Sequence, residues 1–134
     1  MFVNMVNNNL SRLEHYRHEY LTWERMLDFF KQENAFLKTR LSQVVDKKTD
    51  RDFLAYAEHF QNQFIIKDEF IDELNHDVHE MQEQCVREMK VLKINPDKKT
   101  ESRHNKLRNE MEFLEKNFTQ LKNEFNKYVL SVLQ

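Results

Sequence analysis

The chain has 134 residues, of which 40% are hydrophobic and 33% charged, and its net charge is −2. This length fits one domain, and we predict a single helical domain over residues 1–134 that is too apolar to be disordered and has no membrane span. Glycine is absent, which excludes the phosphate-binding loops and nucleophile elbows of many enzymes.

The first predicted helix covers residues 10–46. Ser11-x-x-Glu14 has the pattern of a capping box, which could start the helix. Its apolar residues recur at alternating steps of three and four, which predicts one buried face. The positions on this face are Leu13, Tyr16, Tyr20, Trp23, Leu27, Phe30, Asn34, Leu37, Leu41 and Val44.

The second predicted helix covers residues 50–94. The polar segment 46–50 interrupts the repeat, and either Thr49 or Asp50 could cap the helix. Asn95-Pro96 should end it, because the residue before a proline is disfavoured in helical geometry. The same three-four spacing covers Phe53, Ala57, Phe60, Phe64, Lys67, Ile71, Leu74, Val78, Met81, Cys85, Glu88 and Leu92.

The third predicted helix covers residues 97–133. Asn95 could cap it, with Pro96 in its first turn. Its repeat has the same period as the repeats of the first two helices. The positions are His104, Leu107, Met111, Leu114, Phe118, Leu121, Phe125, Tyr128 and Val132.

The three repeats together predict the fold class. Alternating steps of three and four are typical of helices that wind around one another with a left-handed supercoil. Short connections make neighbouring helices antiparallel. We therefore predict an all-α, elongated antiparallel three-helix coiled-coil bundle with up-down-up topology. A long hairpin whose third helix completes a partner's bundle is the alternative.

A histidine-rich stretch suggests a metal site by its spacing alone. Glu73-x-x-His76 followed by His79 resembles the ligand pattern of carboxylate-bridged sites in helical bundles. The repeat, however, places these side chains on the outer side of the second helix. We predict no metal, cofactor or catalytic site, and hence no enzyme. The alternative is a metal-binding bundle that forms after dimerisation and uses outer-face glutamates with His15, His18, His76 and His79.

A few polar residues interrupt the buried faces. Asn34 and Lys67 are expected to set the helix register. Lys67 can also lay its methylene groups on the core and extend its ammonium group outward. Glu88 and His104 fall at the same level of facing helices, so a hydrogen bond between them is expected. Cys85 is expected to pack as a small apolar residue.

Large apolar residues also occur outside the buried faces, and the hairpin fold places them at similar levels. Such a cluster marks an interface. It favours a protein–protein interaction or scaffold module that acts through helical faces and self-associates as a homodimer, or binds another helical protein. The expected interface residues are Phe29, Phe36, Ile65, Ile66 and Leu130.

Charge and cysteine content limit which partners and which cellular location are expected. Basic residues occur in short clusters beside acids, and nucleic-acid binding needs an extended basic face. We therefore predict no nucleic-acid partner. The N-terminus lacks the basic flank of a secretory signal, and one cysteine suits a reducing compartment. A cytoplasmic location is expected.

The segments WERMLDFF and EHFQNQFIIKDEFIDELNHD, residues 23–30 and 58–77, resemble uncharacterised bacterial helical coiled-coil proteins of similar length. The resemblance implies a helical fold and no function. Spectrin-like repeats are similar in plan, with three long helices and a core tryptophan in the first helix. That likeness concerns architecture alone.

Overall fold

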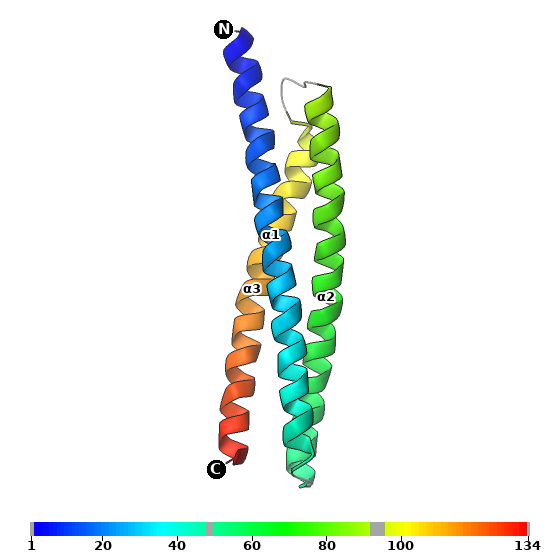
Figure 1. Ribbon diagram of the computed structural model, residues 1–134, viewed down its shortest axis with the longest axis vertical. Coiled ribbons are helices and arrows are strands. Elements are labelled where there is room, and N and C mark those ends of the chain that lie inside the picture. The colour runs from blue at the N-terminus through cyan, green and yellow to red at the C-terminus, as the bar shows by residue number, and fades with distance from the viewer. Residues whose placement is uncertain (1, 48–49, 92–95, 134) are drawn as a thin grey trace. The chain divides into compact units, whose positions relative to one another are not determined.

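Three α-helices make up the computed structural model, which describes the backbone of residues 2–47, 50–91 and 96–133 and the side chains from residue 12 onward within these ranges. They are α1 (Phe2–Val45), α2 (Arg51–Lys90) and α3 (Lys98–Leu133). Figure 1 shows their order along the chain. The described residues include no strand.

The start of α1 differs from the prediction. The helix begins at Phe2, eight residues before the predicted start at residue 10. Ser11 and Glu14 therefore lie inside the helix rather than at its cap, so the capping-box prediction is wrong. The segment before Ser11 contains neither glycine nor proline, the two residues that most strongly interrupt a helix. Nothing in its sequence forces a later start.

The connection between α1 and α2 agrees with the prediction. Asp50 directly precedes α2, and its carbonyl accepts the first helical hydrogen bond from the Leu54 N–H at 2.9 Å. Aspartate is among the preferred residues at this position. Thr49, the other predicted cap, lies outside the described residues.

Asp97 caps α3 in place of the predicted Asn95. The helix begins at Lys98, so Pro96 precedes it instead of lying in its first turn. The Asp97 carboxylate accepts a hydrogen bond from the Lys99 N–H at 3.4 Å. The Asp97 N–H in turn donates to Glu88 Oε1 at 2.7 Å, which ties the connection to α2. The helix α2 ends at Lys90, before the predicted residue 94, and Asn95 lies outside the described residues.

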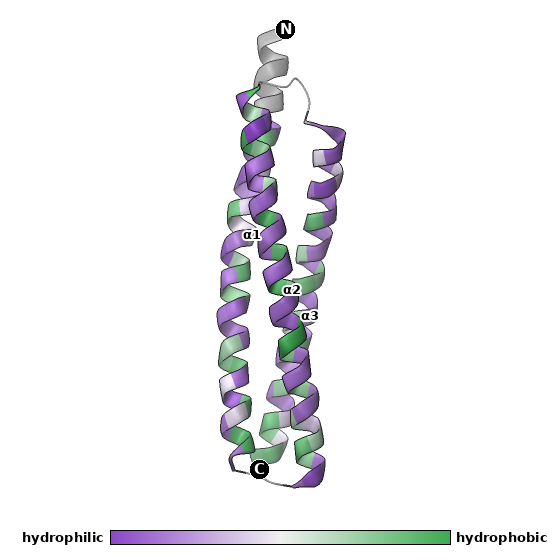
Figure 2. Cartoon of the chain, turned by 90° about the vertical axis from the view of Figure 1, so that its right-hand side faces the viewer, coloured by the Kyte–Doolittle hydropathy of each residue, from purple (hydrophilic) through white to green (hydrophobic). Residues whose placement is uncertain are grey.

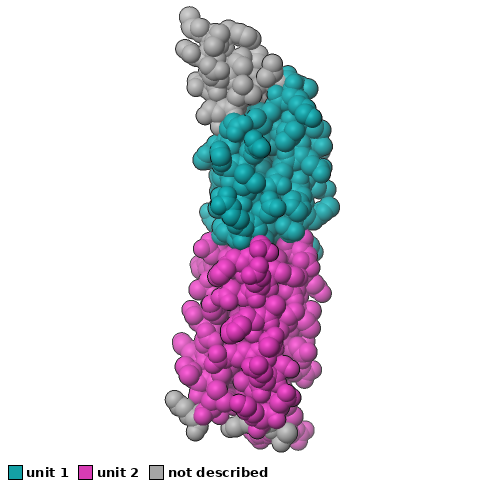
Figure 3. Space-filling model, in the orientation of Figure 1, with its two compact units in different colours: residues 1–27, 73–112 teal, residues 28–72, 113–134 magenta. Residues whose placement is uncertain are grey.

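Contacts divide the chain into two compact units, each built from parts of all three helices. Unit 1 comprises Met1–Leu27 and Glu73–Glu112, and unit 2 comprises Asp28–Asp72 and Phe113–Gln134. Figure 3 colours the two units separately. The single domain expected from the sequence stays a prediction.

In unit 1, α2 runs antiparallel to α1 and α3 runs parallel to it. As the residue number along α1 increases, the residue number of its contact partner on α2 decreases, whereas that of its partner on α3 increases. The contacts that show this are Cys85 with Leu13, Gln82 with Glu24, Glu101 with Arg12, and Arg108 with Glu19.

Unit 2 has the same directions. The later part of α1 (cyan in Figure 1), the early part of α2 and the last part of α3 (orange to red) lie side by side. The prediction of an all-α, up-down-up three-helix bundle is confirmed, and its coiled-coil supercoil stays a prediction. The contacts are Asp72 with Lys31, Asp68 with Lys38, Phe118 with Phe30, Phe125 with Phe60, and Tyr128 with Phe53.

The core consists of the positions that the three-four spacing selects. Almost all of them are buried, while hydrophilic residues occupy much of the remaining helix surface (Figure 2). Val129, which lies beside the repeat of α3, is also buried. The exceptions are Lys67, Tyr128 and Val132, which are half-buried, and Leu92, which lies outside the described residues.

Asn34 is a polar residue inside the core of unit 2. It is fully buried, and its amide nitrogen donates to the Phe64 carbonyl and to Asp68 Oδ1, both at 2.8 Å. Burial alone would raise the pKa of Asp68, but hydrogen bonds from Lys38 and Asn34 outweigh it and lower the pKa. Because these bonds join one turn of α1 to one turn of α2, they favour a single register between the helices.

Within the part of the chain that the structure describes, no helix has a stretch long and apolar enough to cross a lipid bilayer.

Candidate functional site

The five apolar residues expected at an interface are all exposed, and all belong to unit 2. Their side chains are between 43% and 59% accessible to solvent. Exposed apolar side chains that gather in one region mark candidate binding surfaces. They are Phe29, Phe36, Ile65, Ile66 and Leu130.

Phe29 and Phe36 lie on the side of α1 that faces α3. Glu33, on the same helix, accepts a hydrogen bond from Lys122 of α3 at 2.6 Å, which identifies this side. Phe29 and Phe36 are four residues before and three residues after Glu33, so they share its face. Phe36 also lines a cavity of about 210 Å³ together with Leu133 of α3. We call this surface the α1–α3 flank, and its residues are Phe29, Phe36, Arg40, Lys47 and Leu133.

Ile65 and Ile66 lie on the opposite surface of unit 2. Ile65 is three residues before Asp68, which bonds to α1, and Ile66 is four residues before Phe70, whose ring lies 6.2 Å from the Phe113 ring of α3. The two isoleucines therefore lie on either side of the centre of the α2 surface that faces away from the core. We call this surface the α2 outer face, and its residues are Glu58, Asn62, Ile65, Ile66 and Glu69.

The interface residues thus occupy two surfaces of unit 2 rather than one. Leu130 is exposed on α3, one helical turn before Leu133, and so lies beside the α1–α3 flank. Three further apolar side chains of unit 2 are exposed and were not among the predicted interface residues: Leu54, Tyr56 and Phe113. All three are large apolar residues outside the three-four repeat. This position outside the repeat is the sequence signal that could have identified them.

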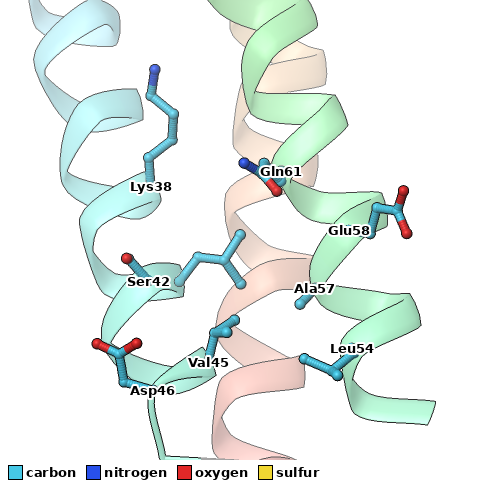
Figure 4. A pocket seen from close by; sticks show the side chains of 9 residues that line it. Lys38, Ser42, Val45, Asp46, Leu54, Ala57, Glu58 and Gln61 are labelled. Carbon is cyan, nitrogen blue, oxygen red and sulfur yellow. The ribbon is translucent and has the colours of Figure 1, made fainter. Parts of the chain in front are cut away.

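A groove in unit 2 lies between α1 and α2 and has a volume of about 560 Å³. Figure 4 shows Leu54 and Ala57 of α2 facing Val45 of α1 across it. Asp46 and Glu58, at its rim, point away from it on opposite sides. The groove can accept an apolar side chain, and its two carboxylates lie at the rim.

A buried polar cluster in unit 1 surrounds His104, which has no solvent exposure. Its Nδ1 lies 2.6 Å from the Tyr20 hydroxyl, and its Nε2 lies 3.1 Å from Glu19 Oε1. A neutral ring that carries its proton on Nε2 satisfies both contacts, with Tyr20 donating and Glu19 accepting. Tyr20 and Glu19 therefore take the place of Glu88, and the predicted Glu88–His104 hydrogen bond is wrong.

Aromatic rings enclose the same imidazole. The Tyr16 ring stacks on it with centroids 3.8 Å apart, and the Trp23 ring lies 5.3 Å away on an interplanar angle of 30°. Burial lowers the pKa of His104, although the Glu19 carboxylate opposes this effect. The ring is therefore neutral near pH 7 and is enclosed by its neighbours.

Arg108 completes the cluster from α3. Its guanidinium donates to both carboxylate oxygens of Glu19, at 2.8 and 3.0 Å. Burial would raise the pKa of Glu19, but the hydrogen bonds from Arg108 and the neighbouring charges outweigh it and lower the pKa. The cluster therefore joins α1 to α3 by charge-assisted hydrogen bonds.

The four outer-face histidines are exposed, as the sequence predicted. No group of three or more histidine, cysteine or acidic side chains is placed to hold a metal ion among the residues whose side chains are described. Three of the histidines contact one carboxylate each. The pairs are His15 with Glu19, His76 with Glu80, and His79 with Glu24.

Cys85 is buried in unit 1, as predicted, and its Sγ lies 3.1 Å from the Leu13 carbonyl oxygen. Burial raises the pKa of the thiol to about 11. We expect iodoacetamide to alkylate it about 100-fold more slowly at pH 8 in the folded chain than in urea, because the thiolate is the reactive form. Mass spectrometry of timed samples measures this, and equal rates would contradict the buried placement.

Comparison of the chain with protein-family models, curated proteins and solved structures found no match. The resemblance to bacterial helical proteins stays an expectation.

Proposed function

We propose that this chain is a protein–protein interaction module that self-associates through the exposed apolar side chains of unit 2. The observation that carries the proposal is the exposure of Phe29, Phe36 and Leu130, each more than half accessible to solvent. A phenylalanine side chain can bury 150–250 Å². Covering each half-exposed ring would therefore stabilise a complex by about 2–3 kcal/mol. The smallest complex that this self-association forms is a homodimer.

Two features support a binding role over a catalytic one. The carboxylates at the rim of the α1–α2 groove point away from it, and His104 is enclosed by its neighbours. A cytoplasmic location is part of the proposal. It suits the free thiol of Cys85, which persists in a reducing compartment.

Phe36→Glu combined with Ile66→Glu tests the proposal. The variant introduces one charge on the α1–α3 flank and one on the α2 outer face, and burying an unpaired charge is costly. We expect helicity to be unchanged by circular dichroism, while light scattering shows a fall in mass toward the 16.6 kDa monomer. An unchanged mass would reject the interface.

The matched control is Leu21→Glu combined with Val86→Glu. These side chains are 39% and 41% exposed and belong to unit 1. The control makes the same chemical change outside the proposed interface. We expect it to keep the mass of the unmodified chain.

A further inference from the structure

The two apolar surfaces of unit 2 carry opposite charges. The α2 outer face has Glu58 and Glu69 on either side of its two isoleucines. The α1–α3 flank has Arg40 and Lys47, which line the cavity beside Phe36. Among the described residues, none of these four charges has an ion-pair partner within unit 2. Each surface therefore offers apolar area together with uncompensated charge of one sign.

Docking of one of these surfaces on the other cannot form a closed contact between two copies. In a three-helix unit each helix packs over the groove between the other two, so the outer side of α2 is opposite the α1–α3 flank. Two copies that join one surface to the other leave one surface of each kind free. Such a contact is heterologous, and it continues from copy to copy.

We infer that the α2 outer face of one copy docks on the α1–α3 flank of a second copy. This inference rests on the self-association proposed above and names the two surfaces that meet. Ile65 and Ile66 cover the cavity of about 210 Å³ at Gln43, one of the residues that line it together with Phe36 and Leu133. The homodimer is then the first step of a head-to-tail assembly.

The spacing of the charges favours one docking register. An antiparallel approach of α2 to α1 that places Ile66 beside Gln43 also places Glu69 beside Arg40. In that register Glu58 comes within about 6 Å of Lys47 along the helix axis, at 1.5 Å per residue. Long side chains span this distance, so both acids reach a base. A parallel approach with Ile66 at the same place brings Glu58 toward the acidic Glu33 instead.

A charge exchange between two variants tests the docking. The first variant carries Arg40→Glu and Lys47→Glu, and the second carries Glu58→Lys and Glu69→Lys. In each variant by itself, the two docking surfaces carry charges of the same sign. We therefore expect the affinity of self-association, measured by sedimentation velocity, to fall at least about tenfold. An equimolar mixture pairs opposite charges again, and we expect its mass to return to that of the unmodified chain.

The control variant carries Glu83→Lys and Glu112→Lys, which make the same change of charge on exposed residues of unit 1. It should associate like the unmodified chain. If the unmodified chain associates but the exchange variants keep its mass, or their mixture stays monomeric, the docking is overturned and self-association stands. If the unmodified chain is monomeric at every concentration, the proposed function itself fails.

Discussion

Replacement of Phe64 by alanine is expected to lower the free energy of unfolding by about 3–5 kcal/mol. The Phe64 side chain has no solvent exposure, and its ring lies 5.2 Å from the Phe125 ring of α3 and 6.4 Å from the Phe60 ring. Alanine would leave a cavity where three helices meet, and the surrounding rings can fill it only in part.

Urea denaturation followed by circular dichroism measures this loss, at a concentration where the chain does not associate. Phe36→Ala is the matched control, because the Phe36 side chain is 59% exposed. We expect the control to change the free energy of unfolding by less than about 1 kcal/mol. Equal losses for the two variants would mean that the core of unit 2 is placed wrongly.

Acidification from pH 7.5 toward pH 5 is expected to lower the stability of the chain through His104. Burial lowers the pKa of His104 below the value of 6.5 that it has in the unfolded chain. As the pH falls through 6.5, the unfolded chain therefore takes up this proton first, and the free energy of unfolding decreases until the folded pKa is passed. Each pKa unit of difference contributes about 1.4 kcal/mol.

The charged groups around the ring come from more than one helix. Glu19 opposes the shift, while Arg108 and His15 reinforce it. The pKa of Glu19 is lowered from 4.5, so the stabilisation that its carboxylate supplies is lost only below pH 4.5. Measurements above pH 5 therefore separate the histidine from the carboxylate.

His104→Gln is expected to flatten the dependence of stability on pH between 7.5 and 5. Glutamine keeps a donor and an acceptor but does not titrate. His76→Gln is the control, since it removes an exposed histidine, and it should keep the slope of the unmodified chain. Urea denaturation at several pH values gives both slopes. A slope that survives in His104→Gln would show that another group causes it.

The fold was predictable because the repeat is long and regular. Steps of three and four identified the core positions from Leu13 to Phe125. These positions are buried in the structure except Lys67, which is half-buried, and Leu92, which lies outside the described residues. The helix ends were less predictable, because several residues near each end can act as caps. At the start of α3, Asp97 and Asn95 both have suitable side chains, and the sequence does not show that Asp97 bonds to both Glu88 and the Lys99 N–H.

The candidate surfaces were predictable only in part. The repeat showed that Phe29, Phe36, Ile65, Ile66 and Leu130 lie outside the core, but not which neighbouring helix each one faces. That depends on the lateral order of the helices, which pairs such as Glu33 with Lys122 reveal. The partners of His104 were missed for the same reason. Glu88 was the expected partner because it falls at the same level as His104 on a facing helix. In the structure, Tyr20 and Glu19 contact the ring from the other neighbouring helix, α1.

Sedimentation equilibrium of the unmodified chain, from micromolar to submillimolar concentration, tests the central claim most directly. The exposed apolar surfaces of unit 2 predict a mass that rises with concentration from 16.6 kDa to twice that value and beyond. A mass that stays at 16.6 kDa over the whole range would contradict self-association.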